Sequence, residues 1–593
     1  MVKQWTMKRA VGDAQIVGRQ FGIDPKLARL LLNRGLHTAA AFEEYLRADD
    51  DCFHDPHALK DADLCCALLL QSISEGKRIR ILGDYDVDGV TSTYIYLRML
   101  RDLGAQADYV IPHRIQDGYG IRMHMIEDAF ADGVEVLLTC DTGIAAYEEV
   151  QRAKELGMTV LITDHHDVPF AEEGGARVYR IPPADAVVNP KQADCGYPVK
   201  GICGAVVAYK ICRILCEKTG RKLRQEFTEL AALATVCDVM ELVGENRALV
   251  KKGLELMQRS SNLGLRTLIS LTVNRVLTSY HLGYIVGPCF NASGRIETAR
   301  EAVELLLART PAEAERLAVH LRDLNEERKQ MTQENLEEAY RQAESYEEDK
   351  VLVIFLPKCH ESLAGIVAGR VKEVWNKPTL VLTNAEGEAD PSLAVKGSGR
   401  SIEAYPMFDR LNEVSYLLTR FGGHPMAAGL SLPAENVDEL RERLNERAQL
   451  TEVDLVKKVP IDMELLPDET DVAFVESLSV LEPFGTGNRK PLFAARGMQI
   501  RRAAVLGQNR NVLRLTFQQP GGRMWHSGVI FGADEILRWQ EEMAAAFGPQ
   551  AVWDTLAGRD AGIVMDLAYE PEIDTWNEQV RVQFVVREYR VRR

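Results

Sequence analysis

Gly83-Asp84-Tyr85-Asp86-Val87-Asp88-Gly89 is the stretch on which the fold and the chemistry of this chain depend. Its three carboxylates lie within five residues, directly after the apolar run from Ile79 to Leu82. Buried like charges at that density repel one another, and a divalent metal ion is the usual compensation. Taken alone, the stretch is also compatible with a solvated acidic turn or with a calcium loop.

Two later segments repeat the layout of an apolar run followed by a polar tip. The runs from Val134 to Thr139 and from Thr159 to Thr163 end in Cys140-Asp141-Thr142-Gly143 and in Asp164-His165-His166. Helical patterns lie between them, at 91–103, 122–131 and 145–156. This alternation predicts βαβ units around a parallel sheet, in which ligands bind at the carboxyl ends of the strands. We therefore expect the three tips to meet at one edge of the sheet.

A fourth carboxylate, Asp238, lies in the apolar run from Leu230 to Met240. A lone Asp in such a run is more often a cap or a hydrogen-bonded core residue, and here it is also a candidate metal ligand. Carboxylates with one or two imidazoles suit Mg²⁺ or Mn²⁺. A carboxylate shared between two ions about 3.5–4 Å apart is the common arrangement for phosphoester hydrolysis.

These motifs resemble the DHH phosphoesterase superfamily and, almost from end to end of the chain, its RecJ family of single-stranded-DNA-specific exonucleases. The chain departs from the family pattern at Leu82, where a histidine is usual, at Cys289-Phe290, where Arg-Ile is usual, and at Val206, where Gly is usual. Whether Asp84 replaces the ligand absent at Leu82 stays open. Besides the acidic tips, the segments that carry the resemblance are 31–35, 54–56, 189–190, 200–205, 287–295, 397–401, 421–429 and 483–488.

The resemblance implies a metal-dependent 5′-to-3′ exonuclease that degrades single-stranded DNA to 5′-mononucleotides by two-metal hydrolysis, in DNA repair and recombination. It implies that Asp141 is shared by both ions, that Asp164 orients His165, and that His166 faces the scissile phosphate. The implied metal ligands are Asp84, Asp86, Asp88, Asp141, His165 and Asp238, all but Asp84 forming the catalytic set with His166. The implied substrate contacts are Arg295, Arg370, Ser398, Gly399, Arg400, Ser401, Gly422, Gly423 and His424.

The patterning predicts an α/β protein in four parts. Residues 1–310 are expected to form an N-terminal segment and a parallel-sheet DHH catalytic domain, and 311–345 a long connecting helix. Residues 346–452 are expected to form a smaller α/β DHHA1 domain with glycine-bearing turns at 397–400 and 422–424. The short alternating segments of residues 455–593 predict an OB-like β-barrel that binds nucleic acid. In the barrel we expect Arg501, Arg502, Arg510 and Arg514 to contact DNA, and most of Phe517, Trp525 and Phe531 to be core.

Composition limits the possible classes of protein. No apolar run reaches the length of about 18 residues that suggests a membrane span, and no apolar signal core follows the first residues. The 11 cysteines show no zinc spacing, which favours reduced thiols and a cytoplasmic location. A net charge of −16 argues against a passive nucleic-acid coat but not against an enzyme with a local basic groove.

Two alternatives to the exonuclease remain. A DHH-family oligonucleotide or cyclic-dinucleotide phosphodiesterase would resemble only the first two domains, so the predicted barrel argues against it. A non-catalytic replication scaffold usually lacks metal-binding acids, all of which are present here. The expected partner is single-stranded DNA, with a single-strand-binding protein or a helicase as candidate protein partners and no membrane.

Overall fold

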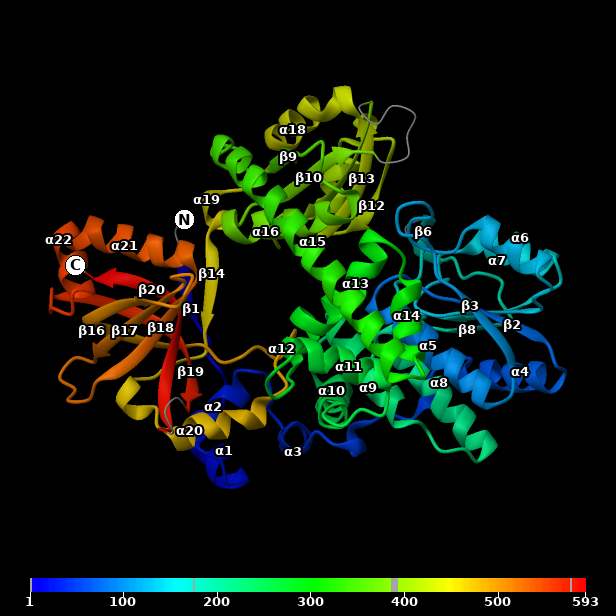
Figure 1. Ribbon diagram of the computed structural model, residues 1–593, viewed down its shortest axis with the longest axis horizontal. Coiled ribbons are helices and arrows are strands. Elements are labelled where there is room, and N and C mark those ends of the chain that lie inside the picture. The colour runs from blue at the N-terminus through cyan, green and yellow to red at the C-terminus, as the bar shows by residue number, and fades with distance from the viewer. Residues whose placement is uncertain (1–2, 174–175, 386–392, 576–578, 593) are drawn as a thin grey trace. The chain divides into compact units, whose positions relative to one another are not determined.

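The computed structural model describes residues 3–173, 176–385, 393–575 and 579–592. The chain forms two compact units (Figure 1). The first comprises Ala48–Val456 and Gly485–Gly487, and the second comprises Val2–Arg47, Lys457–Phe484 and Asn488–Arg593. Each unit combines strands with helices, so the expected α/β class is confirmed. Among the described residues, no helix is long and apolar enough to cross a membrane.

A parallel sheet with the strand order β3-β2-β4-β5-β8 opens the first unit. Strands β2 (Arg78–Leu82), β4 (Val136–Thr139) and β5 (Thr159–Thr163) are almost fully buried, and β3 (Gln106–Val110) and β8 (Ala186–Val188) flank them. The connecting helices are α5 (Val87–Asp102), α6 (Met123–Ala131) and α7 (Tyr147–Glu155). The predicted βαβ alternation is therefore present, and the polar tips leave the carboxyl ends of β2, β4 and β5.

Helices α8 (Gly204–Thr219) and α9 (Gln225–Cys237) pack on α5 and complete the main core. Asp238 is the C-cap of α9, so the apolar run before it is a helix and not a strand. The remaining elements of this domain are α4 (Ala62–Ser74), β6 (Phe170–Glu173), β7 (Ala176–Tyr179), α10 (Gly244–Met257), α11 (Leu263–Thr272), α12 (Ser279–His281), a π-helical turn (Leu282–Val286), α13 (Gly287–Ile296) and α14 (Arg300–Leu307).

The long helix α15 (Pro311–Ser345) has the bounds that its composition predicts. Thr310 caps it, because its hydroxyl accepts a hydrogen bond from the backbone of Glu313, and proline occupies the first turn. Leu317 and Leu321 are buried in the core of the parallel-sheet domain, whereas Ala339 is buried in the core of the following domain. One helix thus contributes to two cores, so its apolar residues are accounted for within the chain.

The next domain carries a mixed sheet in the order β12-β13-β11-β10-β9. Of the strand pairs that the described residues form in this sheet, only β9 and β10 are parallel, and they are joined by α16 (Glu361–Trp375). Among the described elements, the strands are β9 (Leu352–Phe355), β10 (Thr379–Asn384), β11 (Ala394–Arg400), β12 (Arg420–His424) and β13 (Ala427–Pro433), and the further helices are α17 (Met407–Asn412), α18 (Val437–Glu446) and α19 (Glu452–Leu455).

The two glycine-bearing segments of this domain are strands, and the prediction of turns there was wrong. Residues 397–400 lie in β11 and residues 422–424 lie in β12. A Cβ on Gly397 would lie 2.3 Å from Leu382 Cδ2, and one on Gly423 would lie 2.4 Å from the Ala427 carbonyl oxygen. Here glycine permits close packing between neighbouring strands, a role that a local pattern does not distinguish from a turn.

The second unit contains a closed barrel, which confirms the predicted OB-like domain. Its strands pair in the order β16-β17-β18-β20-β19, and β19 pairs back with β16. They are β16 (Phe493–Leu506), β17 (Val512–Gln518), β18 (His526–Phe531), β19 (Ile563–Asp574) and β20 (Arg581–Arg592), with β15 (Met463–Glu464) beside β16. The helices are α20 (Val472–Ser477), the expected α21 (Ala533–Phe547) and α22 (Pro549–Leu556).

The N-terminal segment belongs to this second unit, which differs from the expected grouping of 1–310. Strand β1 (Lys3–Met7) pairs in parallel with β14 (Lys457–Ile461). Helices α1 (Ala14–Phe21), α2 (Pro25–Leu32) and α3 (Ala39–Arg47) follow it. Leu30 and Leu31 are fully buried in the same core as Phe493 of the barrel. Backbone pairing and apolar burial over more than 400 residues of sequence therefore decide this boundary.

The barrel aromatics divide between core and surface. Phe517 is fully buried, as expected for core. Trp525 and Phe531 are 55% and 51% exposed, so the core prediction was wrong for both. Trp525 lies just before β18 and Phe531 is its last residue, where the barrel wall no longer covers them.

Candidate active site

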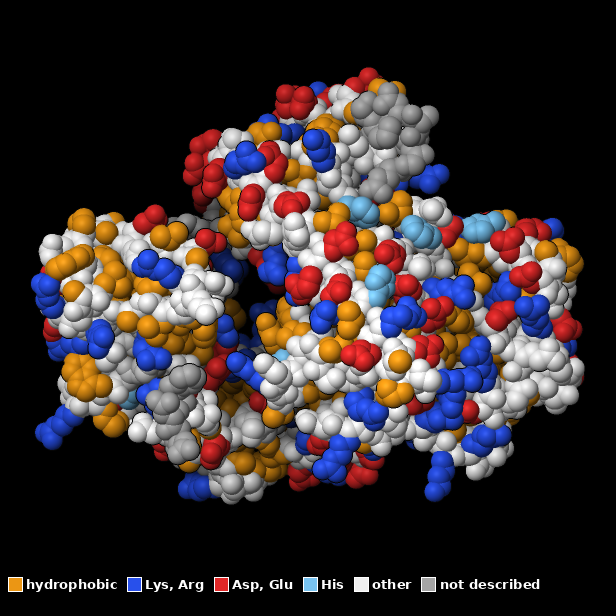
Figure 2. All heavy atoms as spheres, viewed as in Figure 1, with side chains coloured by type: hydrophobic (Ala, Val, Ile, Leu, Met, Phe, Trp, Pro, Cys, Tyr) orange, Lys and Arg blue, Asp and Glu red, His pale blue; other side chains and the backbone are white. Residues whose placement is uncertain are grey.

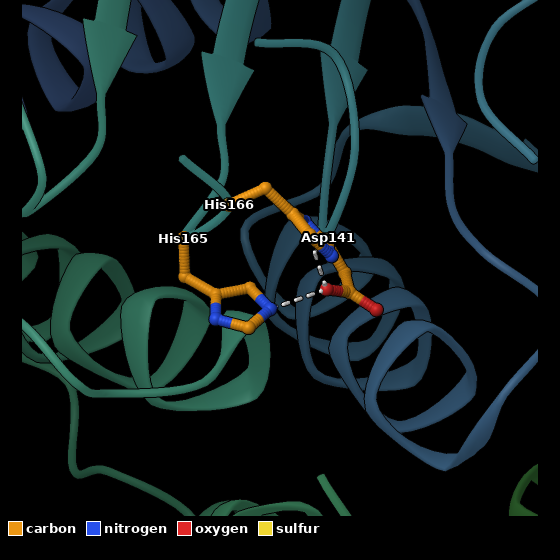
Figure 3. Close-up of side chains that lie close together, drawn as sticks. All are labelled: Asp141, His165 and His166. Carbon is orange, nitrogen blue, oxygen red and sulfur yellow. Dashed lines mark ion pairs between the residues drawn. The ribbon is translucent and has the colours of Figure 1, made fainter. Parts of the chain in front are cut away.

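The polar tips of β2, β4 and β5 meet at one edge of the parallel sheet. His165 Nε2 lies 3.0 Å from Asp141 Oδ1 and 3.5 Å from Asp88 Oδ2. Figure 3 shows the rings of both histidines directed at the same carboxylate oxygen of Asp141. Asp88, Asp141 and His165 are each at most 5% exposed. Because the strands are parallel, residues from three distant segments meet here.

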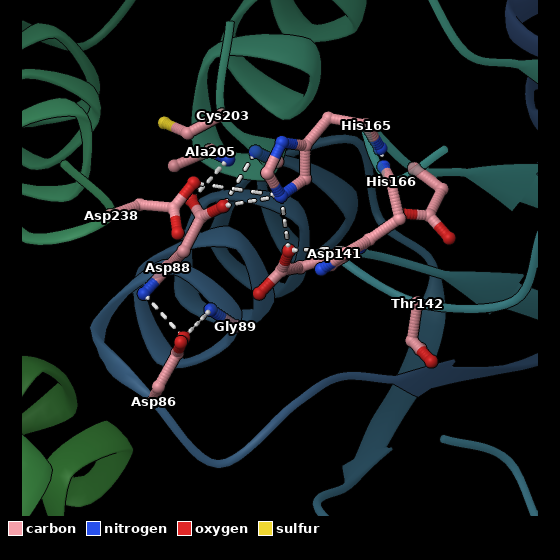
Figure 4. A network of polar contacts seen from close by, with 12 residues as sticks. Asp86, Asp88, Gly89, Asp141, Thr142, His165, His166, Cys203, Ala205 and Asp238 are labelled. Carbon is pink, nitrogen blue, oxygen red and sulfur yellow. Dashed lines mark hydrogen bonds and ion pairs between the residues drawn. The ribbon is translucent and has the colours of Figure 1, made fainter. Parts of the chain in front are cut away.

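The first acidic stretch is held by helix N-termini. Asp86 is the N-cap of α5, and its Oδ1 accepts hydrogen bonds from the backbone of Asp88 and Gly89 at 2.9 and 3.1 Å. Asp88 in turn accepts from the backbone of Gly204 and Ala205, at 2.6 and 2.7 Å, at the start of α8 (Figure 4). These contacts fix both carboxylates without using cationic side chains.

The shape of the site requires glycine at position 204. A Cβ there would lie 2.7 Å from Asp141 Cβ and 3.0 Å from Asp88 Oδ2. Asp141 itself has a positive φ of 61°, and Val239, just after Asp238, has one of 59°. A positive φ is unusual for a β-branched residue such as Val239, and strained backbone of this kind is concentrated at functional sites.

The carboxylates and histidines form three overlapping groups that each could hold a metal ion, and one of them, Asp141 with His165 and His166, overlaps the two groups described next. Asp84, Asp86 and Asp141 form the first group, within which one ligand atom of each residue lies within 4.8 Å of the others. Asp88, His165 and Asp238 form the second group by the same measure. Asp141 Oδ1 lies 3.0 Å from His165 Nε2, so Asp141 borders both groups. This is the arrangement that a shared carboxylate requires.

Several oxygen and nitrogen atoms in these groups that could bind a metal ion are buried without a hydrogen-bond partner. They are Asp84 Oδ1, Asp141 Oδ1, Asp238 Oδ2 and both ring nitrogens of His165. Burial, together with the neighbouring carboxylates, raises the pKa of Asp84 and Asp141 well above the usual range and that of Asp238 to about 9. Buried polar atoms without partners are costly, and a cation would satisfy them. Oxygen donors with one imidazole fit Mg²⁺ or Mn²⁺.

Asp164 contacts a different histidine from the one predicted. Its Oδ1 accepts a hydrogen bond from His166 Nδ1 at 2.8 Å, and its Oδ2 accepts from the backbone of Ile144. His165 Nδ1 has no partner among the described residues. The prediction that Asp164 orients His165 through a ring nitrogen was therefore wrong, because the peptide turn after β5 directs the second imidazole back over Asp164.

The electrostatics of Asp164 and His166 favour an ion pair between the two side chains. Burial opposes ionisation of Asp164, but the His166 contact outweighs it and lowers the pKa of Asp164 to about 2. Burial lowers the pKa of His166, but the hydrogen bond to Asp164 raises it by more, so that the pKa rises to about 9. The His166 side chain is 40% exposed, and its raised pKa favours the protonated ring beside the metal groups.

Arg295 belongs to a cluster of arginines near the first metal group. Burial, with the nearby charges of Arg114 and Arg328, lowers the pKa of Arg295 to about 9. Arg295 donates to the Ser362 carbonyl oxygen at 2.6 Å, and Arg114 lies over the Tyr85 ring at 4.5 Å. A buried guanidinium group whose pKa is lowered by two neighbouring positive charges would be stabilised by an anion between them.

Arg400 extends this basic surface from the second domain. It donates to Ser398 Oγ at 3.1 Å and to the Gly399 carbonyl oxygen at 2.8 Å. A Cβ on Gly365 of α16 would lie 2.8 Å from its Nη2, so glycine there makes room for the guanidinium group. Ser401, by contrast, is 1% exposed and donates to the Tyr405 carbonyl oxygen, so the structure does not present it to a substrate.

The remaining predicted substrate contacts are exposed. Gly422, Gly423 and His424 lie on β12, and space around Gly422 is open. The pKa of Asp167 is lowered chiefly by Lys191 and to a smaller extent by His424, which places His424 near the turn after His166. Arg370 lies on α16 with its side chain 59% exposed and 3.6 Å from Glu373.

Three residues of the site, Arg114, Tyr119 and Gly365, escaped the sequence analysis, and Asn189 was named there only within the segment 189–190, without a role. Arg114 follows β3, and Tyr119 donates or accepts a hydrogen bond with the His166 ring at 3.0 Å. Asn189, at the end of β8, donates to the His166 carbonyl oxygen at 2.9 Å. Gly365 makes room for Arg400. Asn189 follows the last apolar run of the parallel sheet, and that position was a usable signal, whereas the other three give none locally.

The barrel presents its predicted arginines on its own surface. Arg502, Arg510 and Arg514 are exposed. Arg501 forms an ion pair with Asp560 and lies 5.7 Å from the Trp525 ring. An exposed tryptophan beside arginines suits base stacking and phosphate contact.

The comparisons with known proteins agree with this geometry. The model for the DHH family, N-terminal domain, matches residues 78–235. The model for the DHHA1 domain matches residues 348–450, and the model for the RecJ OB domain matches residues 461–588. The first match contains five of the six predicted ligands, and Asp238 lies three residues beyond it.

Relatives resemble the chain over nearly its whole length. The single-stranded-DNA-specific exonuclease RecJ of Bacillus subtilis is 34% identical over 591 residues, which cover 99% of this chain and 70% of that protein. The protein of the same name from Escherichia coli is 31% identical over 542 residues, covering 87% of this chain and 90% of that one. The crystal structure of RecJ in complex with Mn²⁺ from Thermus thermophilus superimposes with a TM-score of 0.79 at 27% identity, covering 99% of this chain and 79% of that one.

Proposed function

Because the chain belongs to the RecJ family of single-stranded-DNA-specific exonucleases, we propose that it hydrolyses single-stranded DNA from the 5′ end with divalent metal ions. The observation that carries the proposal is the set of buried carboxylate and imidazole atoms without partners at the strand ends. A RecJ OB domain match at residues 461–588 favours this function over a small DHH phosphodiesterase. The presence of every predicted metal-binding acid favours it over a non-catalytic scaffold.

The two groups of ligands suit two ions. Asp84, Asp86 and Asp141 would hold one ion, and Asp88, His165 and Asp238 the other, with Asp141 shared. When bound, the ions lower the pKa of a water molecule and neutralise charge on the phosphate. Asp84 takes part in the first group, which supports its role in place of the histidine usual at Leu82.

The side chains around the ions position the substrate. The charged His166, held by Asp164, lies beside Asp141 and would stabilise negative charge that develops on the scissile phosphate. Arg114, Arg295 and Arg400 would hold a neighbouring phosphate of the strand. The backbone contacts of Asp86 and Asp88 keep both carboxylates in place while the substrate charge changes.

A strand series with the purified chain and Mn²⁺ tests this proposal. A long single strand labelled at its 3′ end should shorten in single-nucleotide steps, and a 5′ label should appear at once as mononucleotide. Release of oligonucleotides, or hydrolysis confined to strands of a few nucleotides, would contradict the exonuclease. Absence of hydrolysis with retained strand binding would support the scaffold.

The wider setting belongs to the same proposal. DNA repair and recombination are the processes that consume single strands in this way, and the cytoplasm is the location that keeps free thiols reduced. None of the 11 cysteines, all of which the structure describes, forms a disulfide. A single-strand-binding protein or a helicase stays a predicted partner.

A further inference from the structure

A basic pocket of about 420 Å³ lies in the first unit, away from the metal groups. Four arginines line it: Arg98 and Arg101 from the end of α5, Arg224 before α9, and Arg309 after α14. Figure 2 shows Lys and Arg side chains gathered over α5, α8 and α14. Such a concentration of positive charge is unusual in a chain with a net charge of −16.

The arginine charges are only partly neutralised. Arg224 is paired with Asp102 through two hydrogen bonds and lies 3.9 Å from Glu226. Arg98 Nε is buried without a hydrogen-bond partner, and its nearest carboxylate oxygen, on Asp102, is 3.7 Å away. No described residue forms a hydrogen bond or an ion pair with the guanidinium groups of Arg101 and Arg309. Two carboxylates thus face four arginines, which leaves an excess of two positive charges.

The rest of the lining is ordered and partly apolar. Asn262, the N-cap of α11, donates to Tyr94 Oη at 3.1 Å and to the Leu306 carbonyl oxygen at 2.9 Å. Tyr94 donates to Glu226 at 2.8 Å. The first turns of α9 and α11 open on the pocket, where their backbone N–H groups favour anions. Leu263 and Leu306 add apolar surface, and the volume suits a ligand of nucleotide size.

The pocket is separate from the metal centre. Asp88 stands in the first turn of α5 and Arg101 in the last, so at about 1.5 Å per residue they are about 20 Å apart. Helix α9 runs from Arg224 at the pocket to Asp238 at the metal centre. The Tyr94–Glu226 hydrogen bond joins α5 to α9 at the pocket.

We propose that this pocket binds the phosphates of a nucleotide, with its base or sugar against the apolar wall. The phosphates could come from a free nucleotide or from a DNA strand that passes over this face, since both present the same chemistry to the arginines. Guanidinium groups pair with phosphate oxygens through two parallel hydrogen bonds. The unpartnered Arg98 Nε and the two free guanidinium groups supply such donors.

Binding of fluorescent ATP and of a fluorescent single-stranded 12-mer to the full chain tests the proposal. Both are titrated in EDTA, so that bound metal does not recruit the phosphates. The variant Arg101→Ala/Arg309→Ala removes two exposed cations, and Arg316→Ala/Arg341→Ala on α15 removes two exposed cations elsewhere as the matched control. We expect the pocket variant to bind ATP at least tenfold more weakly and the control to bind it as the wild type does.

The outcomes distinguish a free nucleotide from a DNA strand as the ligand, and they distinguish failure of nucleotide binding from failure of the exonuclease proposal. Weaker binding of ATP identifies a free nucleotide as the ligand, whereas weaker binding of the 12-mer alone identifies the strand. Unchanged affinity for both probes, with unchanged unfolding temperature, overturns the proposal. Arg98→Lys provides a second variant for the same titration. Hydrolysis of a short strand in Mn²⁺ is measured in parallel, because its absence would reject the exonuclease without touching nucleotide binding.

Discussion

At the scale of single residues, the metal centre consists of acids that would repel one another without a cation. Asp84, Asp86 and Asp141 share one small volume, and burial with mutual repulsion raises the pKa of each. The protein offers backbone N–H groups to Asp86 and Asp88 but leaves atoms of Asp84 and Asp141 without partners. The site therefore costs stability until a metal ion binds, which makes metal binding and folding stability linked quantities.

Asp141→Asn should abolish hydrolysis while preserving the fold. Asparagine tolerates the positive φ of 61° better than alanine, for which left-handed backbone costs about 1–2 kcal/mol. Loss of the shared carboxylate should lower the rate by about two to three orders of magnitude or more. The assay is strand hydrolysis in Mn²⁺, and substantial retained activity would contradict the assignment of Asp141.

The same variant has a second expected effect that does not depend on catalysis. In EDTA it should unfold at a higher temperature than the wild type, because the wild type must either bury a repelling Asp141 charge or take up a proton to remove it, and asparagine needs neither. With Mn²⁺ the order should reverse, because the wild type alone gains full metal stabilisation. Thermal unfolding of both proteins with and without metal checks this, and a lower unfolding temperature of the variant in EDTA would argue against stored repulsion.

Substitutions of the two adjacent histidines should differ in their effect on Mn²⁺ affinity. His165→Ala should weaken Mn²⁺ binding, because Nε2 of His165 lies within 3.6 Å of oxygens of Asp88, Asp141 and Asp238 and has no hydrogen-bond partner. His166→Ala should lower turnover strongly and leave Mn²⁺ affinity nearly unchanged, because its Nδ1 is engaged by Asp164. Calorimetric titration of both variants measures this, and equal losses of metal affinity would falsify the division of roles.

At the scale of elements, the start of α8 acts as a support for the metal centre. Its first two backbone N–H groups bind both oxygens of Asp88, and its first residue packs on Asp141. The segment 200–205 is thus informative because of a close backbone approach, and none of its side chains is needed as a ligand.

Gly204→Ala should therefore damage the centre from outside the set of ligands. The added methyl group would displace Asp141 or Asp88, with a cost of about 1–3 kcal/mol. We expect a much smaller rise in unfolding temperature on addition of Mn²⁺ than in the wild type. Gly201→Ala is the matched control, since no atom lies within 4 Å of its added Cβ. Identical behaviour of both variants would reject this role of α8.

At the scale of the whole molecule, the unit that carries the metal centre does not begin at the N-terminus. Residues of β1, α1 and α2 belong to the barrel unit, whose β14 and apolar core they complete. A chain that ended near residue 450 would keep β1, α1 and α2 but would lack β14 and the barrel core on which they pack. A chain of residues 48–456 follows the boundary that the structure shows.

The 48–456 chain should keep Mn²⁺ binding and the hydrolysis of short strands, because every proposed ligand lies within it. It should bind long strands more weakly than the full chain, since stacking is worth about 1–3 kcal/mol per base. Its affinity should also fall less steeply with salt, because fewer phosphates are neutralised. Affinities of both chains across a salt series, with Ca²⁺ in place of Mn²⁺, measure this. Equal affinities and parallel slopes would assign the barrel to another partner.

The sequence by itself determined the elements and the place of the chemistry. Apolar runs with period-specific spacing predict β2, β4 and β5, and the composition of 311–345 predicts α15 to its ends. Parallel topology then requires the acidic tips to meet at one edge, which is why the cluster of candidate metal ligands at the strand ends was predictable. These features depend on local periodicity and on one general rule of sheet geometry.

Only the tertiary structure decided which distant groups touch. It placed residues 3–47 with the barrel, made strands of the segments 397–400 and 422–424, and turned Asp164 toward His166 instead of His165. It also brought Arg114, Arg295 and Arg400 together and gathered four arginines around a second pocket. Such contacts join segments tens to hundreds of residues apart, and their geometry follows from packing in three dimensions, which no local pattern of residues encodes.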